Sequence, residues 1–110
     1  MRFMRLWLDD VRPAPAGYMW IRTVNRAKEV IEDYEELLRV NLGKPTYLIE
    51  LIDIDHDAGD YAFDGGDYIK LLDWLEETGR NYPIRIHSMN VVGVANMRAI
   101  IERNGWKEIR

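Results

Sequence analysis

The sequence predicts an α/β domain built around a mostly parallel β-sheet. Short apolar segments alternate with segments whose apolar residues recur at helical spacing, which is the pattern of successive β–α units. Three of the apolar segments end abruptly in clusters of polar residues. The chain has 110 residues, which is enough for one hydrophobic core and too few for a second domain. We therefore treat residues 1–110 as a single domain.

The first quarter of the chain is expected to contain two strands joined by a loop. Residues 3–8 form the first predicted strand, which ends at Asp9 and Asp10. The segment 12–17 contains two prolines and a glycine, so a helix is excluded there and an extended loop is predicted. A second, short strand is expected over residues 18–22.

A helix and a central strand follow. From Val24 to Leu38 the apolar residues recur at helical spacing, and Thr23 is a suitable N-cap. Residues 41–45, which include a glycine and a proline, are expected to end this helix. Residues 47–54 form the next predicted strand.

Two acidic residues interrupt that strand. Glu50 and Asp53 lie in a segment that should be apolar on both faces if it is a central parallel strand. Either the strand is partly exposed, or these carboxylates join a site or pair across the sheet.

The rest of the chain predicts two more helices. One begins at about Asp67 and ends at Gly79, and the other begins near Val91 and ends at Gly105. Between them residues 84–86 form a short strand, and residues 106–109 are a candidate closing edge strand.

The three polar clusters are the candidate functional residues. They are Asp9-Asp10, Asp55-His56-Asp57 and His87-Ser88-Met89-Asn90. Each directly follows a predicted strand, and in open parallel sheets the carboxyl ends of the strands border one ligand-binding crevice. Both histidines of the chain fall within these clusters. We therefore expect the clusters to meet in space.

The residue types in these clusters indicate phosphate chemistry. Several carboxylates together suit Mg²⁺ or Mn²⁺, and histidine can take up or deliver a proton near neutral pH. Ser88 and Asn90 offer neutral hydrogen-bonding groups beside the predicted start of a helix, where backbone N–H groups favour an anion. Metal-assisted chemistry on a phosphate is the reaction class that uses all of these groups.

Composition limits the partners. The formal net charge is −4, so binding to a long stretch of nucleic acid is disfavoured, while a single phosphate or an RNA end is not. There is no cysteine, which excludes disulfides and thiolate metal sites. No segment resembles a signal peptide or a membrane span, and a cytoplasmic location is expected.

The same residues resemble a known family. The segment from Leu6 to Pro15, the Asp55-His56-Asp57 motif with Gly59, and the segment from His87 to Asn90 with Gly93 and Met97 closely resemble the cyclic-phosphate-processing receiver-like domain family. The resemblance extends from about Arg5 to Ile101. It implies a flavodoxin-like, receiver-like three-layer fold in which the first helix is reduced to the Pro-rich loop.

The resemblance also implies roles for individual residues. In receivers an acidic pair after the first strand and an aspartate after the third hold Mg²⁺, and that third-strand aspartate accepts a phosphoryl group. Asp9, Asp10 and Asp55 match those positions, and Ser88 lies near the position of the receiver hydroxyl. The receiver lysine has no clear match, because Lys107 falls within the last strand pattern.

The leading hypothesis is a metal-dependent phosphoesterase acting on a cyclic phosphate, such as a 2′,3′-cyclic nucleotide or an RNA end. Its expected metal ligands are Asp9, Asp10, Asp55 and Asp57. Its expected catalytic residues are His56, His87 and Asp55, and its phosphate-binding residues are Arg12, Ser88 and Asn90. Two alternatives stay open: a non-enzymatic signalling or nucleotide-sensing module phosphorylated on Asp55, and a Toprim-like nuclease site.

Overall fold

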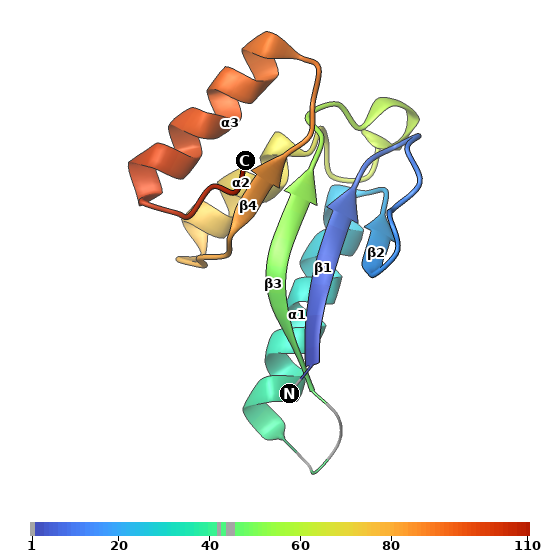
Figure 1. The fold of residues 1–110 in the computed structure, drawn as a ribbon, viewed down its shortest axis with the longest axis vertical. Helices are drawn as coiled ribbons and strands as arrows, with labels where there is room; N and C mark the ends of the chain where they lie inside the picture. Colours follow the sequence, from blue (N-terminus) through green and yellow to red (C-terminus); the bar gives the residue numbers. More distant parts are fainter. Residues whose placement is uncertain (1, 42, 44–45) are drawn as a thin grey trace.

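The structure is a computed structural model, and it describes residues 2–41, 43 and 46–110. These residues form a four-stranded sheet with strand order β2-β1-β3-β4, in which every neighbouring pair is parallel (Figure 1). The strands are β1 (Arg2–Leu8), β2 (Tyr18–Ile21), β3 (Tyr47–Ile54) and β4 (Ile84–Ile86). The α-helices are α1 (Val24–Val40), α2 (Ile69–Glu77) and α3 (Val91–Asn104), and a single 3₁₀ turn, η1, spans Gly59–Tyr61.

The predicted elements are present with small shifts at their ends. No helix connects β1 to β2 within the described residues, so the Pro-rich loop is confirmed. Thr23 caps α1 by accepting a hydrogen bond from the backbone of Arg26. Of the predicted stop after that helix, residues 42, 44 and 45 lie outside the described residues. The expected closing strand at 106–109 is reduced to one parallel bridge between Glu108 and Ile84.

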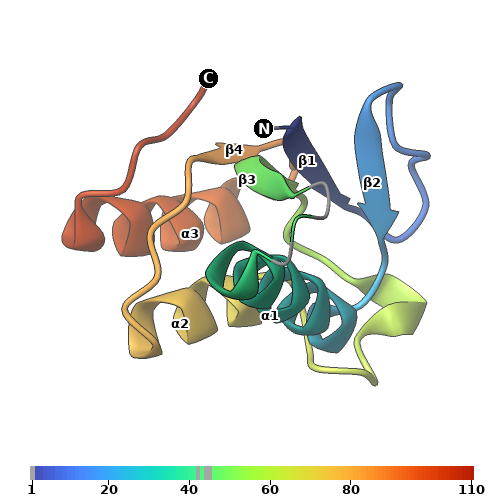
Figure 2. The ribbon, with the colours of Figure 1, turned by 90° about the horizontal axis from the view of Figure 1, so that it is seen from below.

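The α/β class and the flavodoxin-like, receiver-like fold with its parallel sheet are confirmed. The three described helices cover the same face of the sheet, so these residues form two layers and the expected three-layer arrangement is wrong (Figure 2). Right-handed crossover connections explain this arrangement. The connections that contain helices all step across the sheet in one direction, from β2 towards β4 and beyond, so they pass over one face. The β1–β2 connection steps in the opposite direction, so a helix in it would cover the second face. This connection is a loop, and the second face therefore has no helix among the described residues. The three helices that the structure describes are too short or too polar to span a membrane.

The burial of β1 and β3 reflects these two unequal faces. Leu6 and Leu8 point towards the helices and are fully buried, as are Ile52 and Ile54 on β3. On the other face Phe3 is 60 % exposed. The hydrophobic core therefore lies between the sheet and the helices.

The two acidic residues of β3 are accommodated on the helix-free side of the sheet. Glu50 lies where the register between β1 and β3 shifts, and it pairs with Arg5 at 2.6 Å. Asp53 is fully buried and pairs with His87 and Arg85 on the neighbouring β4 side. Both carboxylates therefore pair across the sheet, and Asp53 contacts the candidate site directly.

We predict that the two faces of β3 contribute very differently to stability. Ile52→Ala removes a fully buried side chain and should lower the free energy of unfolding by about 2–5 kcal/mol. Leu48→Ala changes a side chain that is 37 % exposed and should cost about 1 kcal/mol or less. Urea unfolding of both variants tests this, and equal losses would mean that the second face is packed as tightly as the first.

Candidate functional site

Three polar residues are held at the carboxyl edge of the sheet by the hydrogen-bond ladder itself. Their backbone N–H groups continue the parallel pairing beyond the last strand residues. The bonds run from Asp9 to the carbonyl of Ile21, from Asp55 to that of Leu8 and from His87 to that of Ile54, at 3.3, 2.9 and 3.0 Å. The backbone positions of these residues are therefore fixed by the sheet and not by a flexible loop.

Asp9 is a buried carboxylate with several donors around it. One oxygen, Oδ1, accepts hydrogen bonds from the backbone N–H groups of Val11 and Arg12 at 3.0 and 2.8 Å. The other, Oδ2, lies 2.9 Å from Nε2 of His87. Burial by itself would raise the pKa of Asp9, but these three donors together lower it below its usual value. Asp9 is therefore ionised at neutral pH despite its burial.

His87 lies between two buried carboxylates. Its Nδ1 is 2.6 Å from Asp53 and its Nε2 is 2.9 Å from Asp9, while its ring stacks on Trp7 with centroids 3.8 Å apart. A carboxylate oxygen accepts hydrogen bonds and cannot donate them, so a hydrogen bond at either contact requires a hydrogen on that ring nitrogen. His87 thus links the helix-free face of the sheet to its carboxyl edge.

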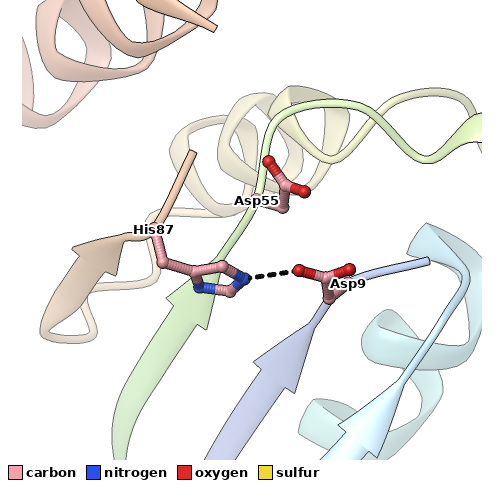
Figure 3. Close-up of side chains that lie close together, drawn as sticks. All are labelled: Asp9, Asp55 and His87. Carbon is pink, nitrogen blue, oxygen red and sulfur yellow. Dashed lines mark hydrogen bonds and ion pairs between the residues drawn. The ribbon is translucent and has the colours of Figure 1, made fainter. Parts of the chain in front are cut away.

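A metal ion fits the chemistry of this edge. One ligand atom each from Asp9, Asp55 and His87 lies within 4.8 Å of the others, and the three side chains lie close together in Figure 3. Burial, and then the nearby charges of Asp9 and Asp55, raise the pKa of Asp10. This repulsion among carboxylates would be relieved by a cation, and oxygen-rich donor sets suit Mg²⁺ or Mn²⁺. Asp10 packs over Gly59, where an added Cβ would lie 2.3 Å from its Oδ2.

His56 belongs to a second group beside the first. Its Nδ1 lies 2.8 Å from Asp57, and the hydrogen bond from His56 outweighs the effect of burial and lowers the pKa of Asp57. The amide of Asn90 lies 3.3 Å from Asp57 and 3.4 Å from Nδ1 of His56. Asn90 is also the N-cap of α3, accepting from the backbone of Gly93. The predicted ligand Asp57 is thus engaged with His56 and Asn90 instead of facing Asp9.

The other predicted phosphate-binding residues lie at the rim of the site. Arg12 is exposed, and its backbone is fixed by the N–H bond to Asp9 and by a carbonyl that accepts from Trp7 Nε1. Ser88 follows His87, and its hydroxyl accepts a hydrogen bond from the backbone of Asn90. Ser88 also lines an apolar pocket of about 460 Å³ beside α3.

Sequence reasoning did not identify Arg22 as part of this edge. Its guanidinium lies 3.9 Å from the ring centroid of Trp20 and donates a hydrogen bond to the hydroxyl of Tyr61 at 3.2 Å. Trp20 in turn donates from Nε1 to the carbonyl of Asp9. Arg22 directly follows β2, which ends at Ile21, but the predicted strand over residues 18–22 includes Arg22, so the sequence pattern does not mark it as a residue that follows a strand.

Tyr68 connects Arg22 to the acidic cluster. It is fully buried, and its hydroxyl donates to the carbonyl of Arg22 at 2.8 Å. Burial, followed by the charges of Asp10, Asp9 and Asp55, raises the pKa of Tyr68. The hydroxyl therefore keeps its proton and continues to fix the backbone where β2 leads into α1.

Lys107 lies at the opposite end of β4 from the site. Its carbonyl accepts from the backbone of Ile84, the first residue of the strand, whereas the site follows the last. The cation that receivers place beside the acidic cluster is therefore not supplied by Lys107.

Sheet order, a helix-free first connection and aspartates after the first and third strands define a receiver-like domain. The family model of the cyclic-phosphate processing receiver domain matches residues 4–103. The chain belongs to this family. Comparisons with curated proteins and with solved structures found no match.

We predict that Gly93→Ala destabilises the protein although alanine is the better helix former. A Cβ at Gly93 would lie 2.5 Å from the His56 ring, so the ring must move or the helix must shift. The gain in helix propensity of about 1 kcal/mol is smaller than the cost of such a clash in a packed site. Thermal unfolding should show a lower Tm.

Asn96→Ala is the matched control, because Asn96 lies on the exposed side of the same helix. It should leave Tm unchanged or raise it slightly. A higher Tm for Gly93→Ala would show that His56 does not pack against α3 as described.

Proposed function

We propose that this domain hydrolyses a cyclic phosphate, such as a 2′,3′-cyclic nucleotide or the cyclic end of an RNA, with Mg²⁺ or Mn²⁺ as cofactor. The observation that carries the proposal is the convergence of Asp9, Asp55 and His87 at one edge of the sheet in a chain of the cyclic-phosphate processing family. Asp10 completes the acidic group that would hold the metal. When bound, such a cation neutralises phosphate charge and activates water.

The two histidines differ in what their surroundings allow. His56 is oriented by Asp57 and Asn90, and its side chain is 15 % exposed, so it is placed to take a proton from water. His87 faces the acidic cluster through Nε2 and is held between two carboxylates, Asp9 at Nε2 and Asp53 at Nδ1. We assign it to deliver a proton to the leaving oxygen.

Positive and neutral donors around the cluster would hold the phosphate. Arg12, Ser88 and Asn90 lie on the loops that follow β1 and β4, and Arg22 lies at the end of β2. The formal net charge of −4 disfavours an extended polyanion, so the ligand is a small phosphorylated molecule or one RNA terminus.

A signalling role with Asp55 as phospho-acceptor is the second candidate. The position of Asp55 after β3, beside the acidic pair that follows β1, favours it. The placement of Lys107 at the far end of β4 counts against it, since an acyl phosphate there would lack the cation that receivers use.

We predict turnover of a 2′,3′-cyclic nucleotide that depends on Mn²⁺ or Mg²⁺ and on this acidic cluster. His56→Ala should slow product formation by about 10²-fold, the scale expected for the loss of a general base. Asp55→Asn should be at least as damaging, because it removes a metal ligand and a charge together. Chromatographic product analysis with cyclic and linear nucleotides measures both effects.

Glu77→Gln removes an exposed carboxylate at the end of α2 and is the control that should keep wild-type rates. A parallel incubation with acetyl phosphate tests for a phosphoryl group on Asp55. If no cyclic substrate is turned over while Asp55 becomes phosphorylated, the signalling role replaces the enzymatic one.

A further inference from the structure

Asp53 is a buried carboxylate for which the proposed reaction has no direct use. It is fully buried on the helix-free face of the sheet, two residues before Asp55. Its Oδ2 accepts from the hydroxyl of Tyr18 at 3.3 Å and lies 3.5 Å from Nη1 of Arg85. A buried carboxylate near the carboxyl end of a central strand is costly unless its partners hold it, so this position calls for an explanation.

The shortest contact of Asp53 is with His87. Its Oδ1 lies 2.6 Å from Nδ1, on the side of the ring that faces away from the acidic cluster. Trp7 stacks on the same ring, with an angle of only 4° between the two ring planes. Tyr18, whose hydroxyl donates to Asp53, packs edge-on against Trp7. The orientation of the ring is therefore set from the helix-free face.

We infer that Asp53 is a positioning residue of the site, which fixes the His87 ring so that Nδ1 carries a hydrogen and Nε2 faces Asp9 and the acidic cluster. A hydrogen-bond partner at one ring nitrogen of a histidine fixes the orientation of the ring, and so fixes which nitrogen faces the other way. Without Asp53 the ring can turn over, and either nitrogen can face the cluster. The effect of Asp53 on the orientation of the ring follows from the observed contacts, whereas its effect on the reaction rate rests on the proposed function.

Nuclear magnetic resonance of the metal-free protein tests the structural part directly. The chain has two histidines, so a His87→Asn variant assigns the ring signals of His87. The Nδ1 proton should appear as a slowly exchanging low-field signal in the wild type. It should move upfield in Asp53→Asn, which keeps the shape of the side chain but not its charge, and disappear in Asp53→Ala.

Glu50→Gln is the matched control. Glu50 is on the same strand and pairs with Arg5, so its loss should leave the His87 signal unchanged. An unchanged signal in either Asp53 variant, or an equal change in Glu50→Gln, overturns the assignment. Because Asp53→Asn preserves volume, the test does not depend on whether Asp53→Ala folds.

Kinetics of the Mn²⁺-loaded protein test the consequence. Asp53→Asn should lower kcat by about 10–100-fold, the usual effect of losing a residue that orients a site histidine, with KM changed by no more than about twofold. A changed His87 signal with an unchanged kcat would overturn the positioning role. If the wild type turns over no cyclic substrate, the proposed function fails, while the resonance experiment still decides whether Asp53 fixes the ring.

Discussion

The parallel pairing of the four strands is the constraint on which the candidate site depends. Parallel neighbours place their carboxyl ends at the same edge, and the ladder bonds continue through Asp9, Asp55 and His87. Parallel pairing brings Asp9 and His87, which are separated by 78 positions in the chain, to the same edge, where they are in contact. Right-handed crossovers then direct all three helices to one face (Figure 2). The other face is left for the aromatic and charged groups that support the site, such as Trp7 and Asp53.

Concentrating carboxylates at this edge carries an electrostatic cost, and the fold offsets it in different ways. Asp9 is stabilised as an anion by two backbone N–H groups and by His87, whereas burial and its acidic neighbours raise the pKa of Asp10. The cluster is therefore only partly neutralised by the protein itself. A divalent cation would complete that neutralisation, which is the physical basis for expecting one here.

Much of this arrangement could be predicted from sequence, because the signals are local. Some signals depend only on neighbouring residues. They are the strand ends at Asp9, Asp55 and His87, the two prolines after β1 and the N-cap at Thr23. Other features depend on contacts between distant residues. Nothing near Asp53 in the chain shows that its carboxylate bonds to His87, and the contact of Asn90 with Asp57 joins residues 33 positions apart. The single bridge at Glu108 also reflects tertiary packing rather than the strand-like pattern of residues 106–109.

A crystal soaked with Mn²⁺ tests the central claim most directly, because anomalous scattering locates the ion independently of any activity. The account predicts one peak at the carboxyl edge of the sheet, within coordination distance of the Asp9 and Asp55 carboxylates and absent from an Asp55→Asn crystal. Coordination of the ion by carboxylate oxygen atoms, with Asp53 still bonded to Nδ1 of His87, would agree with the contacts described above. A fully occupied ion elsewhere on the protein, or no ion at this edge at millimolar Mn²⁺, would contradict it.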